Sequence, residues 1–513
     1  MSEQQQIVLR MQDSVTYVEG RLDKVFYSGL KKVLGFEDEK AVWKQRAVEQ
    51  KFGGKPKWMK NFESYQTTVC YAGKCRCAIK KNGTHFPTGL ISKALEYCKE
   101  FNASYTILNE RSVAVSNGGY SMSDEFEARD YQKKVIDDSC NRERGIIKAA
   151  TGSGKTAMAS GIIAQIGGSP TVFYVTSIDL LKQAHDELTR FVRRSGIPIS
   201  VGQVGGGKCD LQDITIMTVQ TAVKALGHKF KKHDDEDTSD ATKLNEQNKK
   251  DIADFIRGSK VMVCDEIQHW ASKTCQIIAD SSISARYRFG LSATPFRDEG
   301  DDMLIDGCFG KVIADISASF LIDREYLVEP TIYFVHHRTP NLAGAYANVY
   351  KEGIVENAER NLVIANVARK MGDAGRNVLV LVKIIDHGQR LETMIPGSFF
   401  INGSHSSSIR EKWLEKMRRR EAPVTIATSI FDEGVDVKPL DGLILAGSGK
   451  SCTRALQRVG RVLRNFSDEM SGYVKKDAFV VDFQDNMKYM LGHSRKRRKI
   501  YETEPRFVIK DWK

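Results

Sequence analysis

The stretch from Ile146 to Ala159 constrains this chain more than any other. Its sequence, IIKAATGSGKTAMA, passes from a short apolar run through a glycine-containing turn into a helix-forming segment. Glycines let backbone N–H groups close around phosphate oxygens, and the new helix directs its positive end at the same anion. The pattern predicts a P-loop, with Ala149 where the first glycine of GxxxxGK[ST] usually stands.

We expect this loop to bind ATP and Mg²⁺. Lys155 would place its charge at the β- and γ-phosphates, and the Thr156 hydroxyl would ligate Mg²⁺. A glycine turn followed by a surface lysine is the alternative, and it loses weight because partner motifs follow in order. The loop residues expected around the phosphates are Thr151, Gly152, Ser153 and Gly154.

A helix-forming segment, EARDYQKKVIDDSC, precedes the loop. Tyr131, Val135 and Ile136 have the spacing of one buried helical face. The Gln132 amide donates and accepts hydrogen bonds at once, which suits recognition of adenine. A surface glutamine is the alternative for this residue.

A second apolar run, in VMVCDEIQHW, ends in the adjacent carboxylates Asp265 and Glu266. We expect Asp265 to hold Mg²⁺ and Glu266 to orient and deprotonate an attacking water. Acidic pairs are frequent in loops, so this pair alone is a weak signal. The P-loop upstream is what makes the catalytic interpretation specific. RFGLSATPFR then places Ser292 and Thr294 after another strand, where they would relay the state of the phosphates.

Polar residues also follow further apolar runs in the first half of the chain. Buried parallel strands carry functional loops at their carboxyl ends, and neutral donors there suit a sugar-phosphate backbone. The glycines of VGQVGGGK fit a flexible turn equally well. The residues expected to contact nucleic acid are Ser177, Gln183, Gly206, Lys208, Thr218, Gln220 and Thr221.

From about Phe320 the alternation of strands and helices begins again without a second P-loop. The residues expected to contact nucleic acid here are Lys383, His387, Gly403 and Thr428. A structural histidine is the alternative for His387, since lone histidines are usually structural. Gly434 and Asp436, which follow the strand in VTIATSIFDEGVDV, are assigned to the nucleotide site.

The segment ALQRVGRVLR predicts a helix with a polar catalytic face. Gln457, Arg461 and Arg464 lie at positions i, i+4 and i+7, which places them on one side of a helix. Arginines there would neutralise the charge that spreads over a transferring phosphoryl group. A surface basic helix is the alternative. The later basic run SRKRRK, residues 494–499, fits either a nuclear signal or an anion-binding helix end, and we favour the second.

Length and composition set the wider frame. A chain of 513 residues is expected to form about three domains, which we place at 1–115, 116–318 and 319–513. A net charge of +12 favours a polyanionic partner. The absence of a secretory signal or a membrane-length apolar run predicts a soluble, cytoplasmic protein. The ten scattered cysteines fit reduced, buried thiols.

Two regions receive weaker interpretations. The amino-terminal cysteines Cys70, Cys75 and Cys77 with His85 lack the paired spacing of a zinc site, so we expect no metal there. Residues 51–65 interleave basic and aromatic side chains, which suits either nucleic acid or a solvated loop. Residues 229–251 are polar and predict a mobile insertion.

The order of these motifs resembles superfamily 2 helicases and translocases. The segments that carry the resemblance are RDYQ, AATGSGKT, DEIQH, SATP, TSIFDEGVD and QRVGRVLR. The box DEIQH departs from the family by carrying Gln268 where histidine often stands, with His269 just after it. HFPTGLISKALEYCKEFNASYTI, GGGK and VKIIDHG are similar to segments of the phage UvsW-type recombination helicases.

The resemblance implies an α/β fold with two RecA-like parallel-sheet domains in tandem after a small α+β amino-terminal domain. It adds Arg129 of RDYQ to the nucleotide site. It also implies ATP-driven remodelling of Holliday junctions, forks and R-loops beside phage or host recombination and replication proteins, in the cytoplasm of an infected bacterium. A restriction-type duplex translocase, an RNA helicase and a non-enzymatic nucleic-acid binder remain as alternatives.

Overall fold

The structure is a computed structural model. It describes residues 6–20, 24–37, 50, 68–70, 83–167, 170–228, 244–296, 302–337, 339–428, 437–447, 449, 451–468 and 472–512. None of the helices in these ranges is long and apolar enough to cross a bilayer.

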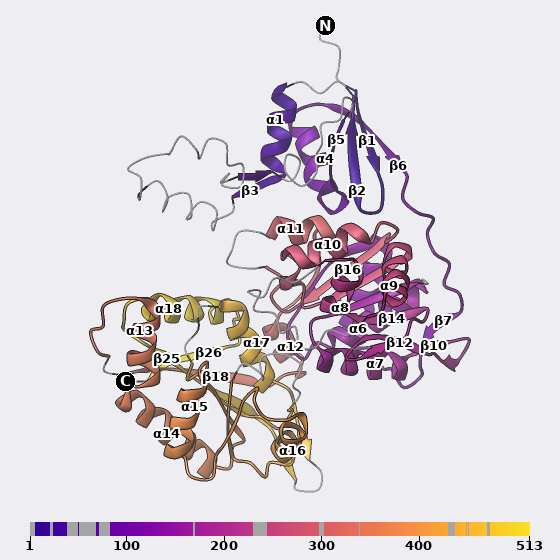
Figure 1. The fold of residues 1–513 in the computed structure, drawn as a ribbon. Helices are drawn as coiled ribbons and strands as arrows, with labels where there is room; N and C mark the ends of the chain where they lie inside the picture. Colours follow the sequence, from indigo (N-terminus) through magenta and orange to yellow (C-terminus); the bar gives the residue numbers. More distant parts are fainter. Residues whose placement is uncertain are drawn as a thin grey trace. The chain divides into compact units, whose positions relative to one another are not determined.

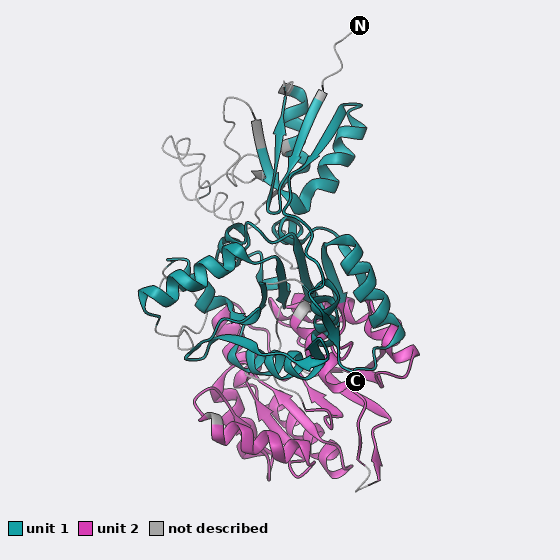
Figure 2. Cartoon of the chain, turned by 90° about the vertical axis from the view of Figure 1, so that its right-hand side faces the viewer, with its two compact units in different colours: residues 1–148, 155–315 teal, residues 149–154, 316–513 magenta. Residues whose placement is uncertain are grey.

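The chain divides into two compact units, coloured separately in Figure 2. The first unit comprises residues 1–148 and 155–315, and the second comprises 149–154 and 316–513. Strands and helices alternate along both units (Figure 1).

A small α+β layer forms the amino-terminal part of the first unit. Its sheet has the strand order β5-β2-β1-β6, and only the β1–β6 pair is parallel. Leu90 and Cys98 are buried in the core of this layer. The elements are β1 (Gln6–Met11), β2 (Val15–Glu19), α1 (Lys24–Val33), β3 (Gly35–Glu37), β4 (Thr68–Cys70), β5 (Gly83–Pro87), η3 (Thr88–Leu90), α4 (Ile91–Glu100) and β6 (Ser104–Asn109).

The larger part of the first unit is an eight-stranded sheet in the order β13-β12-β14-β9-β15-β16-β8-β17. From β12 to β8 each recorded neighbour is parallel. The strands are β8 (Arg144–Ala149), β9 (Thr171–Val175), β12 (Val201–Gly205), β13 (Lys208–Cys209), β14 (Ile214–Thr218), β15 (Val261–Asp265), β16 (Tyr287–Ser292) and β17 (Val312–Ile316). A separate three-stranded sheet contains β7 (Tyr120–Met122), β10 (Val192–Arg194) and β11 (Ile197–Pro198).

Helices cover this sheet because its central strands are mostly apolar on both faces. One core cluster joins strand residues such as Tyr174 and Met262 to Trp270 and to helices on one face. α5 and α6 pack closely, since a Cβ at Gly161 would come 2.3 Å from Ile136 Cδ1. The helices are α5 (Asp130–Arg142), α6 (Lys155–Ile166), α7 (Ile178–Phe191), α8 (Val219–Ala225), α9 (Glu246–Gly258), η5 (Ile267–His269), α10 (Lys273–Ser281) and α11 (Asp302–Phe309).

The second unit has a seven-stranded sheet in the order β20-β21-β19-β22-β25-β18-β26, and its recorded pairs are all parallel. The strands are β18 (Glu329–His336), β19 (Val378–Leu381), β20 (Phe399–Ile401), β21 (Val424–Ala427), β22 (Gly442–Ile444), β25 (Asp477–Gln484) and β26 (Val508–Trp512), besides a small pair, β23 (Ser467–Asp468) and β24 (Tyr473–Val474). The helices are α12 (Ala318–Asp323), α13 (Tyr346–Tyr350), η6 (Lys351–Val355), α14 (Ala358–Asp373), α15 (Ile385–Met394), α16 (Ser407–Arg418), α17 (Cys452–Val462) and α18 (Met490–Tyr501).

The end of the expected insertion is corrected by the structure. Residues 246–251 belong to α9, whereas 229–243 lie outside the described residues. Asn245 caps the helix by accepting a 2.7 Å hydrogen bond from the Asn248 N–H, and Ile252 and Ile256 are buried. Polarity misled the prediction because the first turn of an amphipathic helix is itself polar.

The cap of α9 gives a local test. Asn245→Ala removes the acceptor of the Asn248 amide, at a cost of about 1 kcal/mol. We expect amide hydrogen exchange in the first turn of α9 to become about fivefold faster by mass spectrometry. Gln247→Ala, which removes a surface bond to Asp251, should leave that turn protected. Equal exchange in the Asn245→Ala variant and the unmodified chain would contradict the assignment.

Candidate nucleotide and nucleic-acid sites

The P-loop lies between β8 and α6, as the sequence predicts. Ala149 ends the strand and is fully buried, so a small side chain fits there. Gly152 and Gly154 adopt φ values of +88° and +79°, which residues with a Cβ atom rarely adopt. Lys155 is the first residue of α6 and Thr156 the second, so both stand at the positive end of the helix.

Asp265 ends β15, between the parallel neighbours β9 and β16. Its Oδ1 accepts a 3.0 Å hydrogen bond from the Glu266 N–H. Burial and the neighbouring Glu266 charge raise the pKa of Asp265 to about 7, although the Lys155 charge opposes this rise. An ionised Asp265 is therefore costly in this position unless a cation accompanies it.

Glu266 is linked to the next strand through two side chains. Gln268 Nε2 donates to Glu266 Oε2 over 2.8 Å, and Ser292 Oγ donates to Gln268 Oε1 over 2.6 Å. The Thr294 N–H then donates to Ser292 Oγ over 3.0 Å. The sequence analysis assigned no role to Gln268. In the structure its amide bridges the Glu266 carboxylate and the Ser292 hydroxyl of the SATP segment.

The residues present fit a magnesium ion. Oxygen donors suit Mg²⁺, and Asp265 and Thr156 offer a carboxylate and a hydroxyl. The raised pKa of Asp265 is consistent with this, since a divalent cation would stabilise the ionised carboxylate. Among the described residues there is no cluster of three His, Cys, Asp or Glu side chains that would hold a metal without further ligands.

Arg129 and Gln132 stand at the start of α5. Gln132 is 5% exposed, and its Oε1 accepts a 3.0 Å hydrogen bond from the Arg129 N–H. Arg129 Nη1 donates to the Tyr131 hydroxyl over 2.9 Å. The expected buried face of α5 is confirmed for Tyr131, Val135 and Ile136.

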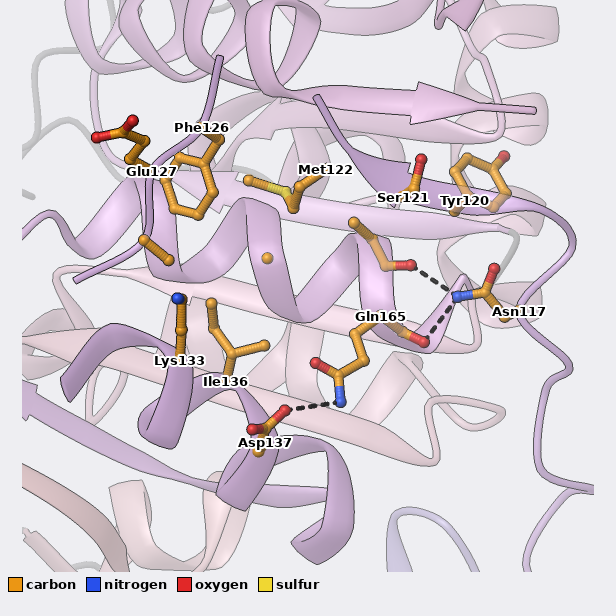
Figure 3. A pocket seen from close by; sticks show the side chains of 13 residues that line it. Asn117, Tyr120, Ser121, Met122, Phe126, Glu127, Lys133, Ile136, Asp137 and Gln165 are labelled. Carbon is orange, nitrogen blue, oxygen red and sulfur yellow. Dashed lines mark hydrogen bonds between the residues drawn. The ribbon is translucent and has the colours of Figure 1, made fainter. Parts of the chain in front are cut away.

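A groove of about 910 Å³ runs between β7, α5 and α6 (Figure 3). Asn117 Nδ2 donates to the Ala164 and Gln165 carbonyls over 2.9 Å at one end, and Gln165 Nε2 donates to Asp137 Oδ1 over 3.1 Å. Gln165 lies near the carboxyl end of α6, about 15 Å along the helix axis from Lys155. This groove is therefore separate from the phosphate loop.

Several expected nucleic-acid residues lie at strand ends in the first unit. Ser177 caps α7 by accepting from the Leu180 N–H over 3.3 Å. Gln183 is bonded to Glu187 on the helix surface, and Gln220 Nε2 donates to the Thr176 carbonyl over 3.0 Å. Gly206 and Gly207 form the turn of the β12–β13 hairpin with φ values of +57° and +85°, just before the exposed Lys208.

The structure corrects two of these expectations. Thr218 and Thr221 are 2% and 0% exposed, and Thr218 Oγ1 donates to Thr221 Oγ1 over 2.8 Å. Their hydroxyl groups are occupied inside the fold because β14 passes directly into α8. In this structure they offer no surface to a strand.

His387 is also corrected. It is fully buried and Nε2 contacts Asn361 Oδ1 over 2.9 Å. Burial and the nearby Arg360 charge lower the pKa of His387 to about 3, so the ring is neutral. Lys383 is exposed, Gly403 lies in an exposed turn after β20, and Thr428 is 8% exposed after β21. Gly434 and Asp436 lie outside the described residues.

The expected arginine face is shorter than the spacing predicts. Gln457 and Arg461 lie on α17, but the helix ends at Val462. Arg464 follows the helix, and its backbone forms an isolated antiparallel bridge with Leu327. The three residues therefore do not form one helical face.

Three buried donors hold the loop that leads from β22 into α17. Arg360 Nη1 donates to the Ala446 carbonyl over 2.8 Å and the Tyr350 hydroxyl donates to Gly447 over 2.6 Å. Arg497 Nη1 donates to the Gly449 carbonyl over 2.8 Å. The loop position, and hence the start of α17, is fixed from three helices.

Each of the two arginines is held by a carboxylate near the end of β25. Arg360 Nε lies 2.8 Å from Asp485 Oδ1, and Arg497 Nη2 lies 2.7 Å from Asp482 Oδ1, with all four side chains 3% exposed or less. Sequence reasoning missed these pairs because Arg360 and Asp485 are far apart in the chain.

The interpretation of SRKRRK as an anion-binding helix end is wrong for two of its arginines. Arg497 is buried against Asp482, and Arg498 contacts Asp511 Oδ1 over 2.6 Å. Both guanidinium groups serve internal ion pairs. Of the amino-terminal cysteines, Cys75 and Cys77 lie outside the described residues, whereas the thiols of Cys98, Cys264 and Cys308 are buried.

Two families match successive parts of the chain. The family described as "Type III restriction enzyme, res subunit" matches residues 125–297, and "Helicase conserved C-terminal domain" matches residues 359–466. These matches and the two parallel sheets confirm the tandem RecA-like α/β fold. Both matches show that the chain resembles superfamily 2 helicases.

Among the members of that class, the chain resembles UvsW of Enterobacteria phage T4. The two sequences are 22% identical, with 82% of this chain and 86% of UvsW covered. A T4 UvsW crystal structure is 18% identical and covers 99% of both chains with a TM-score of 0.42. A structure of Mss116p bound to single-stranded RNA and AMP-PNP has a TM-score of 0.50 at 13% identity and covers 76% of this chain and 75% of that one.

Rad25 from Haloarcula marismortui is 27% identical over 72% of this chain. The chain spans 55% of the length of that relative. The activity, substrates and partners of this chain are therefore proposals.

The buried pair beneath α17 gives a matched stability test. Arg497→Met leaves Asp482 buried without its guanidinium, so we expect a loss of about 3–5 kcal/mol of unfolding free energy. The adjacent Arg498→Met removes a pair whose side chains are 31% and 38% exposed, and should cost less than about 1 kcal/mol. Urea unfolding of the full chain measures both, and equal losses would contradict the assigned difference.

Proposed function

We propose that the chain is an ATP-driven DNA motor that remodels branched DNA. The observation that supports this most is the hydrogen-bonded path from Glu266 through Gln268 to Ser292, beside a P-loop whose glycines have the required φ values. Such a path couples the proposed site of hydrolysis to a second strand end. A simple nucleotide-binding domain has no need of it.

In the proposed reaction, the P-loop backbone and Lys155 bind the triphosphate. Thr156 and Asp265 would hold Mg²⁺, which supplies neutralising charge to the phosphate oxygens. Glu266 orients a water and accepts its proton as the water oxygen attacks the γ-phosphorus and ADP leaves. Arg129 and Gln132 are proposed to contact the base end of the nucleotide.

We further propose that Gln457, Arg461 and Arg464 complete the site from the second unit. Arg464 would act from the chain beyond α17 rather than from the helix face. Gly434 and Asp436 belong to the same proposed wall. Hydrolysis would then require closure of the two units, which couples each turnover to motion along DNA.

The proposed DNA track uses polar and glycine residues near strand ends, several of them exposed and Thr428 largely buried. Ser177, Gln183, Gly206, Lys208, Gln220, Lys383, Gly403 and Thr428 offer neutral and basic donors that suit a sugar-phosphate backbone. The net charge of +12 supports a polyanionic partner.

The resemblance to UvsW, an ATP-dependent DNA helicase, covers most of both chains and supports this assignment. Holliday junctions, forks and R-loops are the proposed substrates. The proposed setting is the cytoplasm of a phage-infected bacterium, among recombination and replication proteins.

Removal of the proposed base gives a direct test. Glu266→Gln keeps the size of the side chain but cannot accept the proton of water, so DNA-stimulated ATP turnover should fall by about 10²- to 10⁴-fold. ATP binding, measured by equilibrium titration, should be retained. Glu246→Gln alters an 89% exposed glutamate in the first turn of α9 and should leave both quantities unchanged. Normal turnover by the Glu266→Gln variant would exclude Glu266 as the base.

The substrate preference is tested by ATPase stimulation across linear single-stranded DNA, duplex DNA, a fork, a four-way junction and duplex RNA. We expect the fork and the junction to stimulate most. Strongest stimulation by plain duplex would favour a restriction-type translocase, an alternative that the match to the restriction-enzyme res subunit also supports. Strongest stimulation by duplex RNA would indicate that RNA, not DNA, is the substrate. Absence of ATPase stimulation by every nucleic acid would indicate a non-enzymatic nucleic-acid binder.

A further inference from the structure

A group of tyrosines and lysines lies beyond the carboxyl ends of β19 and β25. We call Tyr346, Tyr350, Tyr489, Lys383 and Lys488 the tyrosine cluster. The Tyr346 ring stacks on Tyr350 with centroids 5.9 Å apart and planes at 25°. It meets Tyr489 edge-on at 5.9 Å. The rings therefore form one continuous aromatic surface contributed by α13 and the residue before α18.

The cluster has a buried base and an exposed rim. Tyr350 is 3% exposed, and its hydroxyl donates to the Gly447 carbonyl over 2.6 Å. Tyr346 is partly exposed and Tyr489 is 41% exposed. Lys488 Nζ and Tyr489 Oη each donate to the Gly344 carbonyl over 3.3 Å, which fixes the rim to the loop before α13. A ring that is both exposed and fixed loses little entropy when a flat ligand stacks on it.

Tyr489 occupies a strained backbone position. Its φ and ψ are +67° and −45°, and the Met490 N–H donates to the Lys488 carbonyl over 2.9 Å, which defines a γ-turn of the rare positive-φ kind. A glycine would adopt this turn without strain, whereas a tyrosine does so at a cost. Because the ring is exposed, its burial contributes little free energy to offset this strain. The strained backbone therefore motivates a search for a ligand of the ring.

Two cations accompany the rings. Lys383 Nζ lies 5.5 Å from the Tyr346 centroid and 5.2 Å from the Tyr350 centroid, and Lys488 Nζ lies 5.0 Å from the Tyr489 centroid. Within the part of the chain that the structure describes, neither lysine forms an ion pair with a carboxylate. The cluster therefore presents aromatic faces with two lysine ammonium groups beside them.

We propose that the tyrosine cluster binds single-stranded nucleic acid, with a base stacked on Tyr489 and Tyr346 and the flanking phosphates at Lys383 and Lys488. Unpaired bases present π-faces of every sequence, and such surfaces combine aromatic rings with basic side chains. The edge beyond parallel strands is where open α/β sheets bind ligands. The proposal rests on the proposed DNA motor and assigns the contact for a strand unpaired at a branch.

The decisive variant is Tyr489→Gly, because it removes the ring and relieves the backbone strain together. We expect the full chain to melt no lower than the unmodified protein, since glycine accepts the positive φ. We expect about tenfold weaker binding of a fluorescent dT20 by anisotropy at fixed salt. Tyr489→Phe keeps the ring and should bind as the unmodified chain does. Unchanged affinity in the Tyr489→Gly variant would overturn the proposal.

A control residue and a control ligand separate stacking from charge. Trp512, on β26, is 42% exposed and belongs to the same unit, so Trp512→Ala should leave dT20 affinity unchanged. An abasic 20-mer should bind the Tyr489→Gly variant and the unmodified chain equally, because it offers no base to stack. Lys488→Gln should weaken both ligands, since each carries phosphates. Equal loss of both ligands in the Tyr489→Gly variant would exclude base stacking.

The outcomes also separate this inference from the motor itself. Branched DNA that stimulates ATPase while the Tyr489→Gly variant binds dT20 normally would overturn the tyrosine cluster and leave the motor intact. A tenfold loss of dT20 binding without any DNA-stimulated ATPase would overturn the motor and leave the cluster as a binding site.

Discussion

The central strands of both large sheets are parallel and apolar, and the rest of the structure depends on this constraint. In β15 the residues from Val261 to Cys264 are fully buried, so neither face of the strand has room for a polar group. Functional side chains can leave such a sheet only where a strand ends. Each unit therefore gathers carboxylates at a strand end, Asp265 and Glu266 after β15, and Asp482 with Asp485 at the end of β25.

The carboxylates at the strand ends are paired with arginines in the second unit, whereas Asp265 in the first unit is incompletely neutralised. In the second unit each buried carboxylate has a guanidinium against it, and both arginines pass their remaining donors to the loop before α17. In the first unit the pKa of Asp265 is raised, because burial and Glu266 outweigh the Lys155 charge. Satisfied carboxylates build a rigid support for α17, whereas the incompletely neutralised Asp265 is where an added cation has most effect.

The sequence was sufficient for features carried by neighbouring residues. The P-loop, the strand ending at Asp265 and the amphipathic face of α5 all follow from local sequence patterns and are found as expected. It was insufficient where a polar residue has a distant partner. His387 was expected at a surface contact, yet the fold brings it against Asn361 on another helix and buries it. Arg497 resembles part of a basic tail until Asp482 is brought to it.

Two titratable groups, His387 and Asp265, have pKa values shifted in opposite directions. The pKa of His387 is lowered from 6.5 to about 3, so the stability linked to its neutral form is fully present above pH 6.5 and declines as the pH falls from there toward 3. The pKa of Asp265 is raised to about 7, so the stability linked to its protonated form is lost as the pH rises through that value. Near neutrality the charge on Asp265 therefore affects the energy of the P-loop edge. A cation that binds with the triphosphate would stabilise the ionised form of Asp265. We therefore expect nucleotide binding, rather than a change of pH, to cause the proposed closure.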